Sequence, residues 1–143
     1  MKKIEIDTFL KFRFLSNPHF SPDGTKIAFT VSVPDRETNG YLSDLYLYDL
    51  GKKTVSRVTC AGDAKIWSWT AENTLIFTAA RTAALKKEKE NGTSFFYEIS
   101  PSGGEASCRA SVPASVTGIR LLPDRRYLLT IRHDNYKDTR KKS

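Results

Sequence analysis

The side chains of this sequence that could take part in acid–base chemistry include two histidines. His19 and His133 lie 114 residues apart. His133 precedes Asp134, a pairing that suits proton transfer, but it stands in a polar stretch with no nucleophile beside it. His19 adjoins a tight turn, where a structural role is the simpler interpretation. We therefore expect neither histidine to be catalytic.

The sequence also lacks the short motifs of familiar catalytic centres. It contains no Gly-x-Ser-x-Gly nucleophile elbow, no phosphate-binding Gly-x-x-x-x-Gly-Lys, no His-Glu-x-x-His and no Cys-x-x-Cys. Carboxylates recur at one point of an internal repeat, as Asp23, Glu72 and Asp124. A group present in every repeat is better explained by turn chemistry than by catalysis. We expect no catalytic, cofactor-binding or metal-binding residue in this chain, and no cofactor.

The composition and charge of the chain limit which compartment and which partners are expected. Cys60 and Cys108 fall at non-equivalent points of the repeat, so free thiols in the cytoplasm are expected. Glu5 and Asp7 interrupt any apolar leader, and no apolar run exceeds five residues, so neither a signal peptide nor a membrane span is predicted. Of the net charge of +7, residues 137–142 carry +3 and the remaining +4 is scattered, without interleaved aromatic side chains. We therefore expect a solvated surface and not a nucleic-acid site.

The elements that position these residues are organised around the turn Ser21-Pro22-Asp23-Gly24. Its residue types match a type I β-turn position by position. Apolar residues alternate after the turn, at Ile27, Phe29, Val31 and Val33, which is the period of a half-buried strand. The stretch therefore predicts a strand, a tight turn and a second strand.

This unit recurs twice. Residues 69–73 lead into a strand centred on Phe77, and residues 122–126 lead into one centred on Leu129, although both copies lack one turn residue and the glycine. The central residues Phe29, Phe77 and Leu129 are separated by 48 and 52 residues. A period of about 40–50 residues built from strands is typical of β-propeller blades.

We therefore predict an all-β fold, a partial propeller of four-stranded antiparallel blades. Residues 1–143 form one incomplete propeller domain, with an N-terminal segment (1–13), blade one (14–60), blade two (61–112) and the first half of blade three (113–143). Strands are expected at 16–20, 26–33, 43–49, 54–59, 64–69, 74–80, 94–99, 105–110, 116–122 and 127–132, with one helical turn within 83–89.

Two further expectations concern the two ends of the incomplete propeller. Asp7 is expected to cap a short helical segment, Thr8–Phe12, that presents Phe9, Leu10 and Phe14 either as a lid over the sheets or as a docking element. Propellers close with about four to eight blades, so about two and a half cannot form a ring. We expect either a fragment of a longer protein or self-association through open blade edges.

Several stretches together resemble a known family. Ile6–Leu10, Leu15–Phe29 with its Ser-Pro-Asp-Gly turn, Ser43–Tyr48 and Gly103–Ala106 are similar to the start of the propeller domain in prolyl oligopeptidase-family serine peptidases. The acylaminoacyl-peptidase and dipeptidyl-peptidase-like branch is the most similar. The resemblance covers residues 4–132, although other propellers also use the Ser-Pro-Asp-Gly turn.

This resemblance implies a seven- or eight-bladed propeller followed by an α/β-hydrolase domain that carries a Ser, Asp and His triad, none of it in this chain. The propeller of such proteins caps the active site and admits short or unfolded peptides. The first hypothesis is an N-terminal propeller fragment of a serine exopeptidase or oligopeptidase, inactive alone, that gates and selects peptides for the hydrolase domain. The alternative is a stand-alone or self-assembling propeller-like interaction module.

Overall fold

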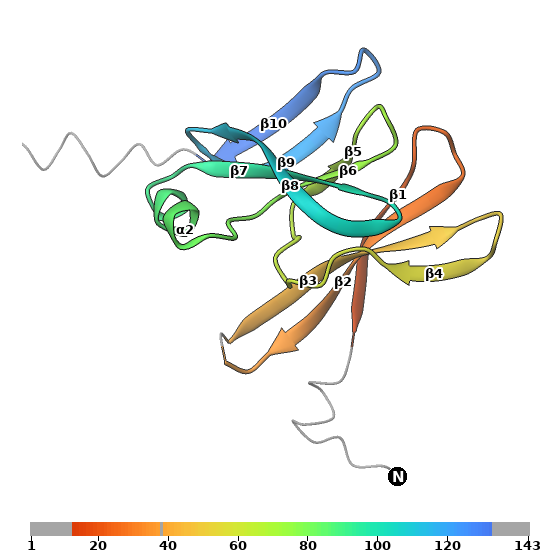
Figure 1. Ribbon diagram of the computed structural model, residues 1–143, viewed down its shortest axis with the longest axis horizontal. Helices are drawn as coiled ribbons and strands as arrows, with labels where there is room; N and C mark the ends of the chain where they lie inside the picture. Colours follow the sequence, from red (N-terminus) through yellow and green to blue (C-terminus); the bar gives the residue numbers. More distant parts are fainter. Residues whose placement is uncertain (1–12, 38, 133–143) are drawn as a thin grey trace, which may run out of the picture.

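The computed structural model describes residues 13–132 except Thr38, and within them three antiparallel sheets follow one another along the chain (Figure 1). The first two sheets are four-stranded meanders and the third is a hairpin. The first sheet comprises β1 (Phe14–Phe20), β2 (Lys26–Asp35), β3 (Gly40–Asp49) and β4 (Thr54–Arg57). The second comprises β5 (Trp67–Trp69), β6 (Leu75–Thr78), β7 (Ser94–Ser100) and β8 (Gly103–Val112), and the third β9 (Ser115–Leu121) and β10 (Tyr127–Arg132).

This arrangement confirms the predicted fold class, with differences at the strand ends. The strands expected at 26–33 and 43–49, with a polar loop between them, are longer than predicted, because β2 runs on to Asp35 and β3 begins at Gly40. Beyond Ser32, β2 pairs with no described residue on its β1 side, so Pro34 lies where a missing backbone N–H is tolerated. The predicted helical segment Thr8–Phe12 lies outside the described residues, and Phe14 begins β1.

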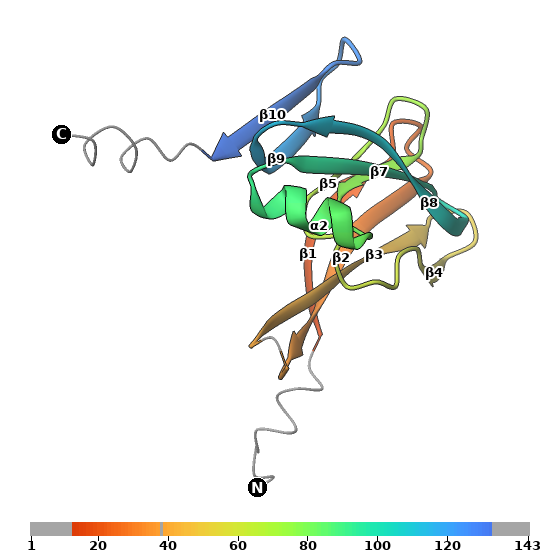
Figure 2. The same cartoon turned by 60° about the vertical axis from the view of Figure 1, so that its left-hand side comes forward.

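The helical turn expected between the second and third strands of blade two is a longer helix, α2 (Ala83–Glu90). The Thr82 side chain caps it by accepting a hydrogen bond from the Leu85 N–H. Figure 2 shows α2 lying alongside β7. Among the described residues, α2 is the only helix, and with eight residues it is neither long nor apolar enough to cross a bilayer.

The predicted turn at Ser21 forms as a closed β-turn. The Gly24 N–H donates to the Ser21 carbonyl at 2.8 Å, and the Lys26 N–H donates to the Ser21 hydroxyl at 3.1 Å. Gly24 has a φ of +72°, and the residues at the corresponding point of the other two turns, Asn73 and Arg125, have φ values of +63° and +71°. All three repeats therefore need a left-handed residue here, which only the first supplies as glycine.

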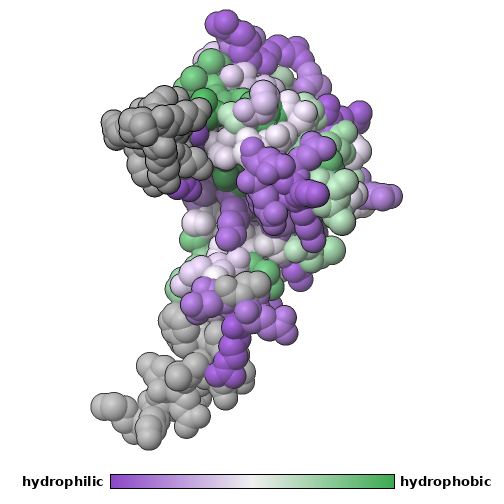
Figure 3. Space-filling model, turned by 90° about the vertical axis from the view of Figure 1, so that its left-hand side faces the viewer, coloured by the Kyte–Doolittle hydropathy of each residue, from purple (hydrophilic) through white to green (hydrophobic). Residues whose placement is uncertain are grey.

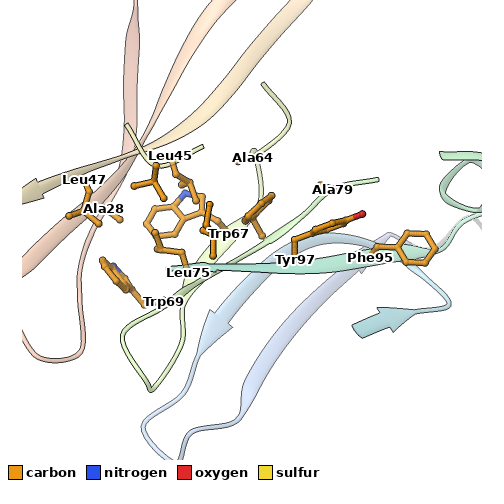
Figure 4. Packing of buried hydrophobic residues seen from close by; sticks show 13 residues of the cluster. Ala28, Leu45, Leu47, Ala64, Trp67, Trp69, Leu75, Ala79, Phe95 and Tyr97 are labelled. Carbon is orange, nitrogen blue, oxygen red and sulfur yellow. The ribbon is translucent and has the colours of Figure 1, made fainter. Parts of the chain in front are cut away.

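The main core lies between the first and second sheets (Figure 4). Small and aliphatic side chains of the first sheet, Ala28, Leu45 and Leu47, face the larger Trp67 and Trp69 of the second. Each buried large apolar side chain stabilises the fold by about 1.5–3 kcal/mol relative to exposure. The two sheets are also joined by hydrogen bonds from the indoles of Trp67 and Trp69 to the first sheet.

The predicted equivalence of Phe29 and Phe77 is visible in the cross-strand pairing. Phe29 pairs with Tyr46, and Phe77 pairs with Tyr97 on the corresponding strand of the next sheet. Phe77 is fully buried because it faces the first sheet, whereas Phe29 lies on the opposite face from Ala28 and is only half-buried. The first sheet therefore presents on its outer face the same Phe–Tyr pair that the second sheet carries on its packed face.

Candidate functional site

The first strands of the three sheets, β1, β5 and β9, come together around a hollow of about 670 Å³. β5 contributes both of its tryptophans and Ser68, and the other two strands contribute their C-terminal ends with the turns that follow. The lining residues are His19, Phe20, Pro22, Trp67, Ser68, Trp69, Ile119, Arg120, Leu121, Leu122 and Pro123. We call the surface formed by these three strands the inner wall.

The two tryptophans of the inner wall are fixed by hydrogen bonds to the first sheet. Trp67 donates its indole N–H to the Thr30 hydroxyl at 2.8 Å, and Trp69 donates to the His19 carbonyl at 3.0 Å. Both side chains are buried, with 7% and 4% of the residue surface exposed. The two tryptophans therefore have fixed positions in the inner wall, because each indole ring is buried and its N–H is hydrogen-bonded.

A bulge in β1 places His19. The register moves from Ser16 opposite Thr30 to His19 opposite Ala28, so Asn17 and Pro18 together oppose one residue of β2. Asn17 adopts a φ of +52°. As a result the His19 ring packs edge-on against Trp67, with ring centroids 5.7 Å apart and an interplanar angle of 72°. The structural role predicted for His19 is thus combined with exposure to the hollow.

The inner wall continues along the strands beyond this hollow. A second depression of about 180 Å³ shares His19, Trp67 and Ile119 with the first, and adds Asn17 and Lys65 among others. β1, β5 and β9 each pair with one described strand only, so no described strand covers their inner edges, although the His19 carbonyl accepts from the Trp69 indole. Aromatic side chains beside strand edges that no other strand covers are the features that bind extended peptides.

The recurring carboxylates are engaged in the turns. Asp23 accepts hydrogen bonds from the Ser21 hydroxyl at 2.6 Å and from the Thr25 N–H and hydroxyl at 3.0 and 2.8 Å. These bonds, chiefly that from Ser21, lower the pKa of Asp23 from 3.8 to about 2. Asp124 accepts from Arg126, whose side chain lies 2.6 Å away and lowers the pKa of that carboxyl.

The third acid of the set, Glu72, connects two turns. It forms an ion pair with Arg125 of the third turn. The Asn73 side chain accepts a hydrogen bond from the Asp23 N–H at 3.1 Å, which joins the second turn to the first. The three turns therefore form one linked row.

The remaining candidates from the sequence are not brought into a common site. Cys60 and Cys108 are free and exposed thiols. Within residues 13–132, Thr38 excluded, no three His, Cys, Asp or Glu side chains are close enough to hold a metal ion. His133 and Asp134 lie outside the described residues. The sequence interpretation missed the inner-wall tryptophans, although two tryptophans spaced by two on a first strand were visible in it.

No family model matches the chain. The uncharacterized peptidase YuxL of Bacillus subtilis (strain 168) is 27% identical over 128 residues, which is 87% of this chain and 18% of that protein. The chain thus spans about a fifth of the length of this curated relative.

Solved structures show the same arrangement of sheets. Acylaminoacyl peptidase of Pyrococcus horikoshii superposes with a TM-score of 0.65 at 17% identity, over 92% of this chain and 19% of that one. The β-propeller domain of the Trilobed protease from Pyrococcus furiosus, described as having an open velcro topology, gives 0.58 at 16% identity, over 85% and 35% of the two chains.

The fold and the inner wall define this chain as an open segment of a β-propeller. The solved structures that it resembles are those of peptidases, and the curated sequence relative is an uncharacterized peptidase. The predicted resemblance to the propeller of prolyl oligopeptidase-family peptidases is thereby confirmed at the level of the fold.

Proposed function

We propose that this chain is the N-terminal propeller part of a serine peptidase and acts together with an α/β-hydrolase domain. The observation that carries the proposal is the 27% identity to a curated peptidase over 128 residues. In this proposal residues 1–143 are one incomplete propeller domain divided at 14–60, 61–112 and 113–143. The exposed free thiols Cys60 and Cys108 agree with a reducing, cytoplasmic setting.

The composition of the first sheet supports a ring that is completed by further blades. Its outer face carries Phe29 and Tyr46, whose ring centroids lie 6.1 Å apart, and Phe20 and Val55, which are 64% and 60% exposed. The matching face of the second sheet is covered by the first sheet. A further sheet packed on the outer face would bury these side chains in the same way.

The role proposed for the propeller is to gate and select short peptides. The inner wall supports this role because it combines fixed aromatic side chains with strand edges that no described strand covers. Both tryptophans of the chain lie in it, so a peptide bound there changes their fluorescence. Titration with an unstructured apolar heptapeptide should shift the emission of the chain, and a folded protein of similar composition should not. An unchanged emission spectrum at saturating peptide would remove the inner wall from peptide selection.

The peptidase assignment is tested by the gene from which this chain is translated. Sequencing past the codon for Ser143 should reveal in-frame strand repeats and, further on, a Gly-x-Ser-x-Gly elbow between a strand and a helix. The complete product should hydrolyse an acyl-peptide p-nitroanilide and lose this activity with a serine-directed phosphonate. The 143-residue chain alone should not hydrolyse this substrate. Phosphonate-sensitive hydrolysis by the 143-residue chain alone would contradict the proposal.

A second candidate function is a self-assembling interaction module, and the third sheet is the observation that favours it. On its outer side β10 has no described partner strand, and Leu128 and Ile131 are 55% and 51% exposed. Unpaired edges of this kind recruit other chains. Light scattering on the purified chain distinguishes the candidates: a stable closed dimer or trimer supports the module, and a monomer contradicts it.

A further inference from the structure

A second large hollow, of about 710 Å³, lies where β6 leads into α2, and it shares no lining residue with the inner wall. Three of its lining residues are cationic and two are anionic. The lining residues are Ala61, Asp63, Ala80, Arg81, Lys86, Lys89 and Glu90. Figure 3 views the side of the molecule on which α2 lies in Figure 1, and hydrophilic side chains gather there next to apolar surface. We call this hollow the Arg81 pocket.

The Arg81 guanidinium is held in one orientation before any ligand arrives. It stacks over the rings of Phe77 and Tyr97, at 5.0 and 5.3 Å from their centroids. Asp63 accepts from its Nε at 3.1 Å and from its Nη2 at 3.0 Å. No described residue accepts a hydrogen bond from Nη1. A planar donor that is already fixed loses little entropy when it binds a carboxylate.

The helix α2 supplies the other two cations. Lys86 and Lys89 are three residues apart, so they lie on one face of the helix, and both side chains are exposed. Leu85 anchors the helix because it packs against the core. In the first sheet the corresponding connection is short, because β2 ends at Asp35 and β3 begins at Gly40. The lysines of α2 are therefore a local addition to blade two.

We propose that the Arg81 pocket is a docking site for an acidic peptide segment of a partner protein. Asp63 neutralises much of the Arg81 charge, so Lys86 and Lys89 leave the pocket with a modest positive balance and Nη1 as a directed donor. This suits one or two carboxylates more than a nucleic acid, because Asp63 and Glu90 repel a continuous row of phosphates. The rings of Phe77 and Tyr97 are also buried beneath Arg81 and are not open to stacking bases.

The test uses a fluorescein-labelled peptide of alternating glutamate and glycine, with fluorescence anisotropy at low ionic strength. The unmodified chain should bind it, and a lysine–glycine peptide should not bind. The double variant Lys86→Gln/Lys89→Gln should weaken binding about fivefold. Arg81→Lys keeps the charge but loses the planar guanidinium donors, and it should weaken binding about tenfold.

The matched control is Lys52→Gln/Lys53→Gln, which removes two exposed lysines from the turn between β3 and β4 and should change binding less than about twofold. Arg81→Lys also alters packing on the core rings, so circular dichroism accompanies it, and the exposed Lys86/Lys89 pair decides the test if Arg81→Lys unfolds. The proposal is overturned if the acidic peptide does not bind. Equal weakening by the control pair also overturns it, as does tighter, Lys86/Lys89-dependent binding of an oligothymidylate.

Discussion

The hydrogen bond from the Trp67 indole to the Thr30 hydroxyl is the polar contact that most directly joins the first two sheets. Both residues are buried, with 7% and 3% of their surface exposed, and the two atoms lie 2.8 Å apart. Thr30→Val keeps the shape of the side chain but removes the acceptor. The Trp67 N–H is then buried without a partner. We expect this change to lower the free energy of unfolding by about 1–3 kcal/mol.

The reciprocal change, Trp67→Phe, removes the donor and part of an aromatic ring, and should lower the free energy of unfolding by about 2–4 kcal/mol. In the double variant no partner is left unsatisfied, so the two effects should not add. The coupling energy should be about 1 kcal/mol, which is typical of groups in direct contact.

The assay is urea denaturation followed by far-ultraviolet circular dichroism, which does not depend on the mutated tryptophan. The control is Thr117→Val, an exposed threonine whose hydroxyl donates to the Thr130 carbonyl at 3.2 Å, and it should change stability by less than about 0.5 kcal/mol. Additive losses in the double variant, or a Thr30→Val loss no larger than that of Thr117→Val, would refute the described packing of the first sheet on the second.

Three further predictions concern the turns. Gly24→Ala should lower the free energy of unfolding by about 1 kcal/mol, because φ is +72° and a Cβ meets no other obstacle. Arg125→Gly should be neutral or stabilising, because relief at φ +71° offsets an exposed ion pair worth at most about 1 kcal/mol; both variants are compared by urea denaturation. The folded-state pKa of Asp23, about 2, lies below its ordinary value of 3.8, so its stabilisation is present above about pH 4 and is lost as pH falls toward 2. Ser21→Ala removes the largest cause of this shift and should flatten that part of the acid-unfolding curve; an unchanged curve would contradict the assignment.

Much of the fold follows from sequence because local and tertiary preferences agree in it. The Ser21-Pro22-Asp23-Gly24 turn and the alternation after it fix a hairpin, and the recurrence at Phe77 and Leu129 extends it to three sheets. The differences arise where backbone pairing overrides residue type. Proline is typical of loops, yet the antiparallel pairing of β2 with β3 continues through Pro34.

The site was harder to predict, because its features depend on contacts between sheets. Trp67 and Trp69 appear in the sequence as strand residues, and only the position of the first sheet shows that they are hydrogen-bonded at the inner wall. The sequence indicates a structural role for His19 beside the tight turn. The bulge in β1, which the alternation of apolar residues does not indicate, places the His19 ring against Trp67. Arg81 likewise becomes notable only when Asp63, from the connection between the sheets, reaches its guanidinium.

The central claim is that successive sheets of this chain pack face to face around a common inner wall, as blades of a propeller do. The most direct test is a ¹⁵N-edited nuclear Overhauser spectrum of the labelled chain, in which its two tryptophans give two indole signals. We predict cross-peaks from the Trp67 indole proton to the Thr30 side chain and from the Trp69 indole proton to His19, since both contacts join different sheets. Indole protons with cross-peaks only to residues of their own sheet would contradict the account.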